Sequence, residues 1–333
     1  MPQVSVLLPI HRAGATLEPC LETIRRQTFE DWECILADDG SEDDSMEIAR
    51  RFADIDRRFV LLPGPHLGLV GTLERGRAAC RGTWVARMDA DDLMIRDRLR
   101  LQVDALAADA GLAAVGTHVR IFPRAEMGAG LRAYEKWLRS IRDAHGVARE
   151  AFIECPVAHP TWMIRRSILD TYGYRDRGWP EDYDLLLRLL ADGHRFGVIP
   201  RALVAWREHP ARLTHNHDAY RIGEFPRLKA HFLRHGFLDG HRTYVLWGYG
   251  HTGRALRRAL ADHDLHPSHI VELHPGRLGQ RIHGADVVPP DHLPHLRGEP
   301  IVASVAGAGP RSEVRSALAR MGFDELRDFV CAA

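Results

Sequence analysis

Several features that mark common protein classes are missing from this 333-residue sequence. Its 45 Lys and Arg residues equal its 45 Asp and Glu residues, so it lacks the basic excess of a general nucleic-acid-binding protein. No apolar run approaches the ~18 residues that span a membrane. The N-terminal stretch MPQVSVLLPIHR lacks the basic start and the cleavage site of a signal peptide. We therefore expect a cytoplasmic protein that binds no nucleic acid.

Cysteine is also scarce. The five cysteines are odd in number, and no two of them have the spacing C-x-x-C. This pattern argues against a disulfide framework and against a structural zinc site. Most of the five lie among apolar neighbours, which favours buried, reduced thiols.

The first part of the chain alternates between two kinds of pattern. Short segments rich in apolar and β-branched residues, typical of strands, lie at 4–9, 32–39, 59–64, 84–89 and 112–122. Between them, apolar residues recur at the spacing of helices, as at Leu17, Leu21 and Ile24. This alternation predicts an α/β fold with a mostly parallel sheet that helices cover on both faces.

The remaining sequence predicts two further parts. A helix is expected at 178–193, because Pro180 falls in its first turn and Gly193 at its end. A new strand–turn–helix pattern begins near residue 242. The predicted parts are a first domain over 1–215, a helical bridge over 216–241 and a small Rossmann-like α/β domain over 242–333.

Three groups of acidic residues stand at the expected boundaries of these elements: DDGSEDD from 38, DADD from 89 and PEDYD from 180. Each group has a purely structural explanation, since Asp favours helix N-termini through capping and through the helix dipole. In the third group, Asp184 can also pair with Arg188 one turn later. On this explanation the acids only cap helices and turns.

The same groups also fit a site for phosphate-bearing substrates. In parallel sheets, ligands bind beyond the carboxyl ends of the strands. The acids expected at such ends are Asp38, Asp39, Asp89, Asp91 and Asp92. An Asp-x-Asp pair there can hold Mg²⁺ or Mn²⁺ together with substrate phosphate oxygens. A separate acid at a helix start, Asp182, can act as a general base.

The ordered set of motifs resembles family 2 of the inverting glycosyltransferases, which have the GT-A fold. The matching stretches are VSVLLPIHRA, QTFEDWECILADDGSEDDS, GLVGTLERGRAACRGTWVARMDADDLMIRDRL, AHPTWMIRRS, EDYDLLLRL and WREHP. The resemblance covers residues 1–215. It implies an enzyme that moves a sugar from a nucleotide-diphosphate donor to a hydroxyl group, with inversion at the sugar.

The resemblance also implies where the donor binds. Asp39, with Asp38 beside it, would bind the nucleotide base, usually uracil. Pro9, Asp89 and Asp91 would line the rest of the donor nucleotide site. The sequence departs from the family at Ile10-His11-Arg12, where Tyr-Asn or Phe-Asn is usual, and at Glu74, where Asn is common. These departures bear on base recognition and on the donor-sugar pocket.

The metal ligands and the catalytic base follow from the same resemblance. Asp91 or Asp92 would be the main ligand of Mg²⁺ or Mn²⁺, and His209 would lie close to the diphosphate and the metal. Asp182 would be the catalytic base, with Glu181 as its neighbour. The residues implied near the donor or the acceptor are His159, Glu181 and Arg188.

The resemblance further implies a saccharide or lipid-linked acceptor, surface polysaccharide or lipopolysaccharide biosynthesis, and peripheral attachment at the inner face of the membrane. The sugar, the acceptor and the oligomeric state stay open. Two other functions compete with this one. A nucleotidyltransferase would have a glycine- and lysine-rich N-terminal loop, and LLPIHRAGATLE has no lysine. A non-catalytic nucleotide-sensing protein would act through the C-terminal domain.

The C-terminal domain carries a motif of its own. GYGHTG satisfies G-x-G-x-x-G with Gly248, Gly250 and Gly253, follows an expected strand, and precedes an expected helix. Glu272 ends the next strand, where a ribose-binding acid would lie. The motif indicates either a second nucleotide site or only tight packing of a strand against a helix. Every catalytic candidate precedes residue 210, so we expect this domain to be dispensable for the chemical step.

Overall fold

The computed structural model describes residues 1–210, 212, 217–221 and 223–333. Within these residues the chain divides into two compact units. The first comprises Met1–Val147, Val157–Arg177 and Asp184–His215, and the second comprises Ala148–Pro156, Gly178–Tyr183 and Asn216–Ala333. The predicted boundary between residues 215 and 216 lies outside the described residues. The second unit also takes up two short segments from the range predicted for the first domain.

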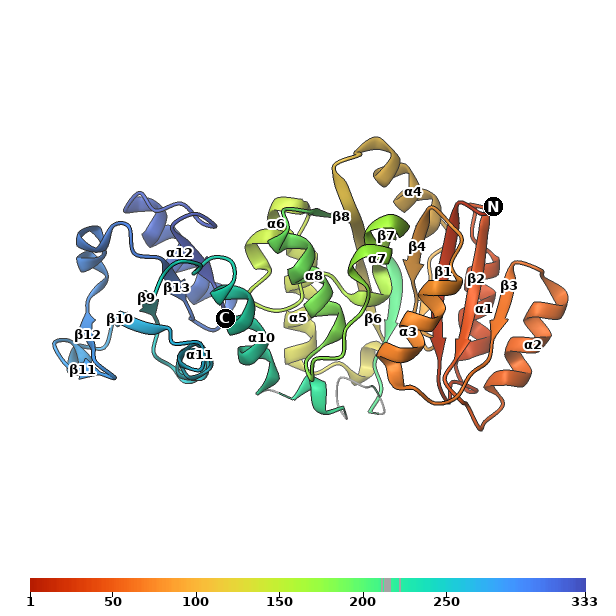
Figure 1. Ribbon diagram of the computed structural model, residues 1–333, viewed down its shortest axis with the longest axis horizontal. Helices are drawn as coiled ribbons and strands as arrows, with labels where there is room; N and C mark the ends of the chain where they lie inside the picture. Colours follow the sequence, from red (N-terminus) through yellow and green to blue (C-terminus); the bar gives the residue numbers. More distant parts are fainter. Residues whose placement is uncertain (211, 213–216, 222) are drawn as a thin grey trace. The chain divides into compact units, whose positions relative to one another are not determined.

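The first unit is built on a mixed sheet (Figure 1). Its strands among the described residues are β1 (Val4–Ile10), β2 (Trp32–Asp38), β3 (Phe59–Leu62), β4 (Trp84–Arg87), β5 (Leu93–Met94), β6 (Leu112–Phe122), β7 (Met163–Arg165) and β8 (Arg195–Arg207). They lie in the order β3-β2-β1-β4-β7-β6-β8-β5. The first four run parallel, β7 is antiparallel to both neighbours, and β8 is parallel to β6. The predicted α/β fold with a mainly parallel sheet is confirmed.

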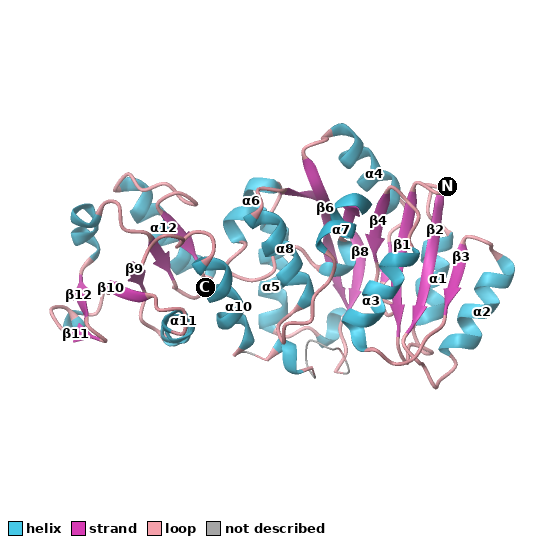
Figure 2. Ribbon diagram, viewed as in Figure 1, coloured by secondary structure: helices cyan, strands magenta, loops and turns pink. Residues whose placement is uncertain are grey.

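Helices cover both faces of the parallel half of this sheet (Figure 2). The helices of this part of the chain are α1 (Leu17–Arg25), α2 (Ser45–Ile55), α3 (Gly68–Ala79), α4 (Arg98–Ala108), α5 (Ala129–Ser140), α6 (Ala144–Glu150), α7 (Arg166–Tyr172) and α8 (Glu181–Ala191). Val6 and Leu8 of β1 face the core under α1, α2 and α4. Leu7 points to the other face, where a side chain on Gly76 of α3 would collide with it. Successive side chains of β1 point to opposite faces of the sheet, and helices bury both of these faces.

The second unit has a smaller sheet. Its strands are β9 (Thr243–Trp247), β10 (His266–Val271), β11 (Arg281–Ile282), β12 (Ala285–Val288), β13 (Ile301–Ala303) and β14 (Phe329–Cys331), in the order β11-β12-β10-β9-β13-β14. Its helices include α10 (Glu224–Arg234), α11 (His251–Ala261) and α12 (Ala308–Arg320). Tyr244 and Leu246 pack on the side of α10 and α11, whereas Val245 and Trp247 pack on the side of α12. The predicted second α/β sheet is thus present.

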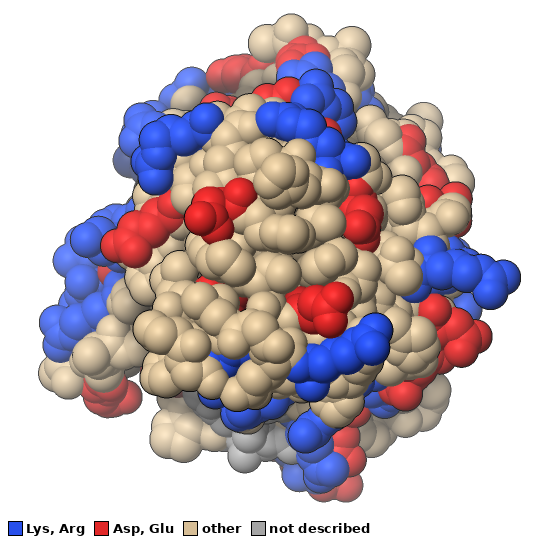
Figure 3. Space-filling view, turned by 90° about the vertical axis from the view of Figure 1, so that its left-hand side faces the viewer, with Lys and Arg blue, Asp and Glu red and all other residues tan. Residues whose placement is uncertain are grey.

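The surface of the second unit that faces the viewer in Figure 3 carries mixed charge. Acidic and basic side chains are interspersed around a largely uncharged centre (Figure 3). This mixture agrees with the equal numbers of acidic and basic residues in the sequence. None of the helices formed by the described residues is both long enough and apolar enough to span a membrane.

The capping explanation for DADD is wrong. Asp91 and Asp92 do not cap a helix, because the short strand β5 follows them and α4 begins only at Arg98. Strand β5 pairs antiparallel with β8, where Leu93 lies beside Ala205. The turn that carries the acids is therefore fixed by strand pairing with a distant segment, and the dipole of α4 does not offset their charge.

Candidate active site

The acids of DDGSEDD and DADD flank the same strand end. Residues of β1 lie beside β2 on one side, with Ile10 next to Asp38, and beside β4 on the other, with Leu7 next to Arg87. The amide of Asp39 donates to the carbonyl of Ile10 at 2.8 Å. Since β1, β2 and β4 are parallel, their carboxyl ends form one edge of the sheet. The structure therefore brings Asp38, Asp39 and the 89–92 turn to that edge.

Asp89, Asp91 and Asp92 form a cluster at this edge. Each offers a carboxylate oxygen, and these oxygens all lie within 4.8 Å of one another. The side chains of Asp89 and Asp91 are each 27% exposed. Asp89 pairs with Arg87, and Oδ2 of Asp91 lies 2.8 Å from Nε2 of His209. His209, which the resemblance implies near the diphosphate and the metal, therefore lies beside Asp91.

Asp92 differs from its neighbours because it is fully buried. Its Oδ1 accepts from the backbone amide of Arg207 at 2.7 Å. Its Oδ2 is buried and has no hydrogen-bond partner among the described residues. Burial, and then the charges of Asp89 and Asp91, raise the pKa of Asp92 well above its usual range. Asp92 thus supports the turn from inside the protein.

The pKa of Asp91 is also raised, by burial and by Asp89, although the bond from His209 opposes the shift. Three carboxylates crowded together are the donor set that a hard divalent cation takes. The partly exposed carboxylates of Asp89 and Asp91 offer oxygens that such a cation can reach. The residues present therefore fit Mg²⁺ or Mn²⁺.

Two arginines that sequence reasoning missed support this turn and the end of the strand before it. Arg207 donates from Nε to the carbonyl of Asp91 at 2.7 Å, in addition to its amide bond to Asp92. Arg98 is fully buried and donates to the carbonyls of Arg87, at 2.8 Å, and Trp162, at 3.2 Å. Burial lowers the pKa of Arg98 to about 9, and the charge of Asp92 opposes that shift. The arginine in WREHP was the available signal for the first of these.

Asp39 is held by a different set of donors. Its Oδ1 accepts from the amide of Leu67 and from the hydroxyl of Thr72, both at 2.6 Å, and its Oδ2 lies 2.9 Å from Nδ1 of His66. Burial disfavours the charged form, but the bonds from Thr72 and Leu67 outweigh it and lower the pKa of Asp39. Asp39 therefore stays a charged acceptor at this edge of the sheet.

The neighbours of Asp39 divide into structural residues and exposed ones. Asp38 accepts from the amides of Gly40, at 3.1 Å, and Ser41, at 3.2 Å, so its carboxylate closes the turn. Pro9 lies in β1 beside Ala37 and is partly buried. The imidazoles of His11 and His66 stack at 4.6 Å beside Asp39. His66 was not predicted, because nothing in its local sequence marks it.

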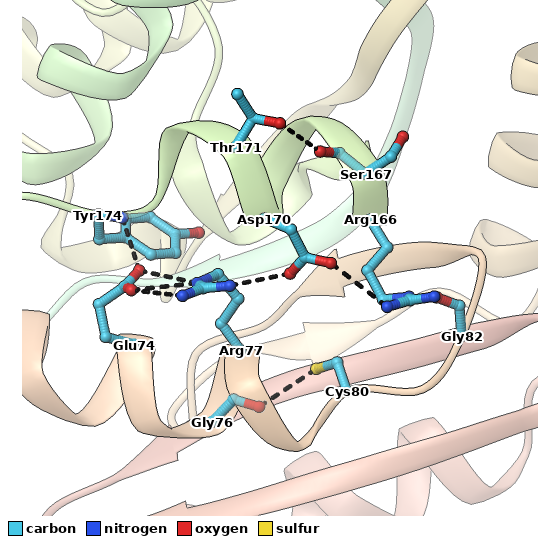
Figure 4. A network of polar contacts seen from close by, with 10 residues as sticks. All are labelled: Glu74, Gly76, Arg77, Cys80, Gly82, Arg166, Ser167, Asp170, Thr171 and Tyr174. Carbon is cyan, nitrogen blue, oxygen red and sulfur yellow. Dashed lines mark hydrogen bonds and ion pairs between the residues drawn. The ribbon is translucent and has the colours of Figure 1, made fainter.

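His159 belongs to a chain of contacts that starts at Glu74. Nε2 of His159 lies 3.0 Å from the hydroxyl of Tyr174, and the amide of Tyr174 donates to Glu74 at 2.6 Å. Figure 4 shows that Glu74 also meets Arg77, which reaches Asp170 of α7. Glu74, the departure from the family pattern, thus ties α3 to the segment after α7. His159 itself is buried.

Arg188 is committed to protein contacts inside the first unit. Its Nε donates to Asp184 at 2.7 Å, and its terminal nitrogens donate to the carbonyls of Tyr172 and Gly173, each at 2.7 Å. The predicted helical pair of Asp184 and Arg188 is therefore present and buried. This arrangement anchors α8 to the end of α7.

Asp182 and Glu181 begin α8 and belong to the second compact unit, unlike the other predicted residues of the donor site. Oδ1 of Asp182 accepts from the amide of Tyr183 at 2.7 Å. Glu181 is buried and accepts from the hydroxyl of Tyr220 at 2.9 Å. The hydroxyl of Tyr183 donates to the carbonyl of Ala151 at 2.6 Å. The start of α8 is thus supported by residues of the second unit.

Comparison with known proteins gives two kinds of match. The chain is 32% identical over 227 residues to EpsE, a putative glycosyltransferase of Bacillus subtilis (strain 168), covering 66% of this chain and 78% of EpsE. It is 28% identical over 249 residues to AmsE, an amylovoran biosynthesis glycosyltransferase of Erwinia amylovora, covering 73% of this chain and 91% of AmsE.

Solved structures show the same fold at lower identity. S. aureus TarS 1–349 in complex with UDP-GlcNAc superposes with a TM-score of 0.54 at 14% identity, covering 79% of this chain and 72% of that one. The mannosyltransferase PcManGT from Pyrobaculum calidifontis, in complex with GDP-Man and Mn²⁺, superposes with a TM-score of 0.54 at 18% identity, covering 79% and 69%. These likenesses confirm the predicted GT-A fold.

The family model "Glycosyl transferase family 2" matches residues 5–173. This range includes most of β1, Asp39 with its donors Leu67 and Thr72, and the 89–92 cluster, and it ends before α8. Together with the identity to EpsE, the match establishes that the chain belongs to glycosyl transferase family 2 and is a glycosyltransferase.

Proposed function

We propose that this enzyme transfers a sugar, with inversion, from a nucleoside-diphosphate donor to a hydroxyl group of a saccharide or lipid-linked acceptor, in a reaction that depends on Mg²⁺ or Mn²⁺. One observation carries the proposal. The carboxylates of Asp89, Asp91 and Asp92 crowd within 4.8 Å at the edge of the sheet that also presents Asp39. A donor needs both features at once, a base acceptor and a site for its diphosphate.

The exposure of the three carboxylates separates their roles. Asp89 and Asp91 are partly exposed, whereas Asp92 is buried and bonded to Arg207. Asp89 and Asp91, with His209, would hold the cation, and Asp92 would fix the turn. When bound, the cation supplies neutralisation of the charge that develops on the diphosphate leaving group. Arg207 and Arg98 keep the turn in one conformation, so that the ligands are arranged before the donor arrives.

Asp182 would act on the acceptor. A sugar hydroxyl is a weak nucleophile at neutral pH, and a carboxylate that takes up its proton lowers the barrier to attack on the anomeric carbon. A single displacement from the opposite face inverts that carbon. The support for this role is the position of Asp182 in the first turn of α8, in the motif EDYDLLLRL that resembles the family's catalytic helix.

A uridine donor is the part of the proposal that rests on Asp39. Its lowered pKa keeps it an acceptor, and uracil offers one ring N–H to such a group. The two solved neighbours carry different bases, since TarS was solved with UDP-GlcNAc and PcManGT with GDP-Man. The name of AmsE, an amylovoran biosynthesis glycosyltransferase, supports a place in polysaccharide biosynthesis.

A donor-hydrolysis assay on the full chain tests the proposal. Purified enzyme is incubated with UDP-sugars and GDP-sugars, with Mn²⁺, Mg²⁺ or EDTA, and released nucleotide is measured. We expect release of UDP that requires the metal and exceeds release of GDP. In a parallel incubation with a nucleoside triphosphate and a sugar 1-phosphate, release of pyrophosphate would instead indicate a nucleotidyltransferase, and binding without turnover in either assay would indicate a nucleotide-sensing protein. With an acceptor in hand, the anomeric configuration of the product tests inversion.

A further inference from the structure

The sheet of the second unit has the strand order of a nucleotide-binding fold. Strands β12, β10, β9, β13 and β14 lie side by side and are all parallel. Numbered along the chain, they stand third, second, first, fourth and fifth across the sheet. The order reverses between β9 and β13, and ligands of open parallel sheets bind beyond the strand ends at such a point. The motif GYGHTG begins where β9 ends.

Two of the three glycines in this motif are explained by packing. Gly248 has a φ of +97°, and a side chain on it would meet the carbonyl oxygen of Ser304 at 2.9 Å. A side chain on Gly253 would meet the carbonyl oxygen of Gly248 at 2.0 Å. Both positions must therefore be glycine for α11 to approach β9 and β13. Packing of the helix against the strands therefore explains why Gly248 and Gly253 are glycines.

Packing does not explain Gly250. Its φ is −75°, which any residue adopts, and a side chain on it would meet nothing within 4 Å. It is also the N-cap of α11, and it has no side chain that could accept a hydrogen bond from a backbone amide of the first turn. Glycine is a weaker N-cap than Ser, Asp or Asn, so helix stability does not explain it. A glycine with open space before a helix N-terminus allows a phosphate to approach the backbone amides.

A second observation points to a ligand at the same place. Ser304 follows β13 directly and is only 2% exposed, yet its hydroxyl has no hydrogen-bond partner among the described residues. The Cβ of Ser304 lies 3.8 Å from where a Cβ on Gly253, in the first turn of α11, would lie. The hydroxyl of Thr252 donates to the carbonyl of Ser304 at 3.3 Å. A buried hydroxyl without a partner is costly, and a phosphate oxygen would satisfy it.

The neighbouring strand end offers groups for the rest of a nucleotide. Glu272 follows β10, its Oε1 lies 2.7 Å from a terminal nitrogen of Arg277, and its Oε2 accepts from the amide of Leu273 at 3.2 Å. A carboxylate so placed can still accept from the two hydroxyls of a ribose, because each oxygen has a second lone pair. Leu273 is 72% exposed beside it, an apolar surface of the kind that a base covers.

We propose that the second unit binds a ribonucleotide diphosphate with free 2′- and 3′-hydroxyls, its phosphates at the first turn of α11 beside Ser304 and its ribose at Glu272. This site is separate from the sugar-transfer site, needs no metal, and stands whether or not the proposed transfer reaction is correct. ADP, UDP and NAD⁺ share the required chemistry, and they differ in the base and in what the diphosphate carries.

The test is calorimetric titration of the full-length protein in EDTA with ADP, UDP, NAD⁺ and NADP⁺. We expect at least one of ADP, UDP and NAD⁺ to bind. The order of their affinities shows which nucleotide the site prefers. NADP⁺ should bind at least ten-fold more weakly than NAD⁺, since Glu272 repels a 2′-phosphate. Absence of binding by all four nucleotides, or equal binding of NADP⁺ and NAD⁺, would overturn the proposal.

Variants locate the binding. Gly250→Asp places a carboxylate in the phosphate path while giving α11 a favourable N-cap, so the protein should stay folded and lose binding at least ten-fold. Gly130→Asp is the matched control, because Gly130 lies in the first turn of α5 and a side chain there also meets nothing within 4 Å. Ser304→Ala should weaken binding several-fold. Binding that survives Gly250→Asp, with an unchanged melting temperature, would show that the site is elsewhere.

Discussion

Adjacent aspartates in one turn have opposite surroundings in this enzyme. Asp91 is partly exposed and contacts His209, whereas Asp92 is buried and bonds to a backbone amide. The sequence DADD leaves the choice of metal ligand open, because both residues are equally close to the strand end. The structure favours Asp91, since a ligand needs an oxygen that the cation can reach.

Replacing Asp91 and Asp92 separately tests this difference. Asp91→Asn should weaken Mn²⁺ binding at least ten-fold, because one charged ligand is lost. Asp92→Asn should keep binding within a few-fold, since its amide oxygen can still accept from Arg207. Mn²⁺ titration followed by electron paramagnetic resonance measures both. The reverse ranking would make Asp92 the main ligand and refute our assignment.

Asp182 is the residue on which the proposed chemistry depends most. Asp182→Asn should lower turnover by ~10²-fold or more, the usual effect of losing a general base, while donor affinity changes little. Asp104→Asn, an aspartate with a 63% exposed side chain on α4, serves as the control for the substitution itself. Steady-state kinetics and donor titration give the two quantities. Turnover near the wild-type value would exclude Asp182 as the base.

At the scale of single elements, α8 contains a buried ion pair whose arginine also donates to the carbonyls of Tyr172 and Gly173 at the end of α7. The side chains of Arg188 and Asp184 are 8% and 3% exposed. Arg188→Met removes the guanidinium from a buried carboxylate and should lower the free energy of unfolding by about 3–5 kcal/mol. The exposed pair of Arg195 and Asp109 is the control, where Arg195→Met should cost about 0–1 kcal/mol. Equal losses in urea unfolding would argue against the role of burial.

Helix α10 depends on a buried lysine, which gives a pH dependence. Nζ of Lys229 donates to the carbonyls of Ile153, at 2.6 Å, and Ala332, at 3.0 Å. Burial lowers the pKa of Lys229 from 10.5 to about 8, against the opposing charge of Glu154. Between these two values the unfolded chain binds more protons than the folded one, so raising the pH through this window stabilises the fold.

Lys229→Met removes that dependence. The melting temperature of the wild type relative to the variant should therefore rise from pH 8 to pH 10, and should stay constant below pH 7, where Lys229 is protonated in both states. Differential scanning fluorimetry in matched buffers measures the difference. A difference that falls or stays flat across this range would show that the ammonium is not destabilised by burial.

At the scale of the whole molecule, the chain crosses between its two units several times. The segments 148–156 and 178–183 belong to the second unit, although residues of the first unit precede and follow them. Phe152 and Ile153 pack into the core of the second unit, and Arg315 pairs with Glu150 at 2.8 Å. The sequence predicts a dispensable C-terminal domain, but these contacts lead to a different expectation.

A protein that ends at Arg221 should lose donor hydrolysis together with order at 148–156 and 178–183. The removed part includes Lys229 and Arg315, and the remaining chain would expose Phe152 and Ile153. Hydrogen exchange of both segments and metal-dependent hydrolysis are the measurements, and adding residues 222–333 in trans should restore both. Native exchange rates and full hydrolysis by the truncated protein would show instead that the first 221 residues suffice.

The sequence by itself determined the α/β fold, the family and the acids at the strand ends. These follow from local patterns: apolar segments set the strands, and Asp39 and Asp89 stand at the ends of two of those segments. Helix α8 was equally predictable from Pro180 and Gly193. The glycines of GYGHTG were visible too, but their sequence could not separate packing from binding, because only Gly250 faces open space.

Only the tertiary structure decided which acid is buried, what holds it, and where the start of α8 belongs. Asp92 is bonded to Arg207, 115 residues away, and Asp39 to Thr72, 33 residues away. Strand β5 forms through pairing with β8, which is why the expected cap at Asp91 and Asp92 is absent. Such contacts depend on how distant segments pack against each other. The sequence around one residue therefore does not show which distant residue it will contact.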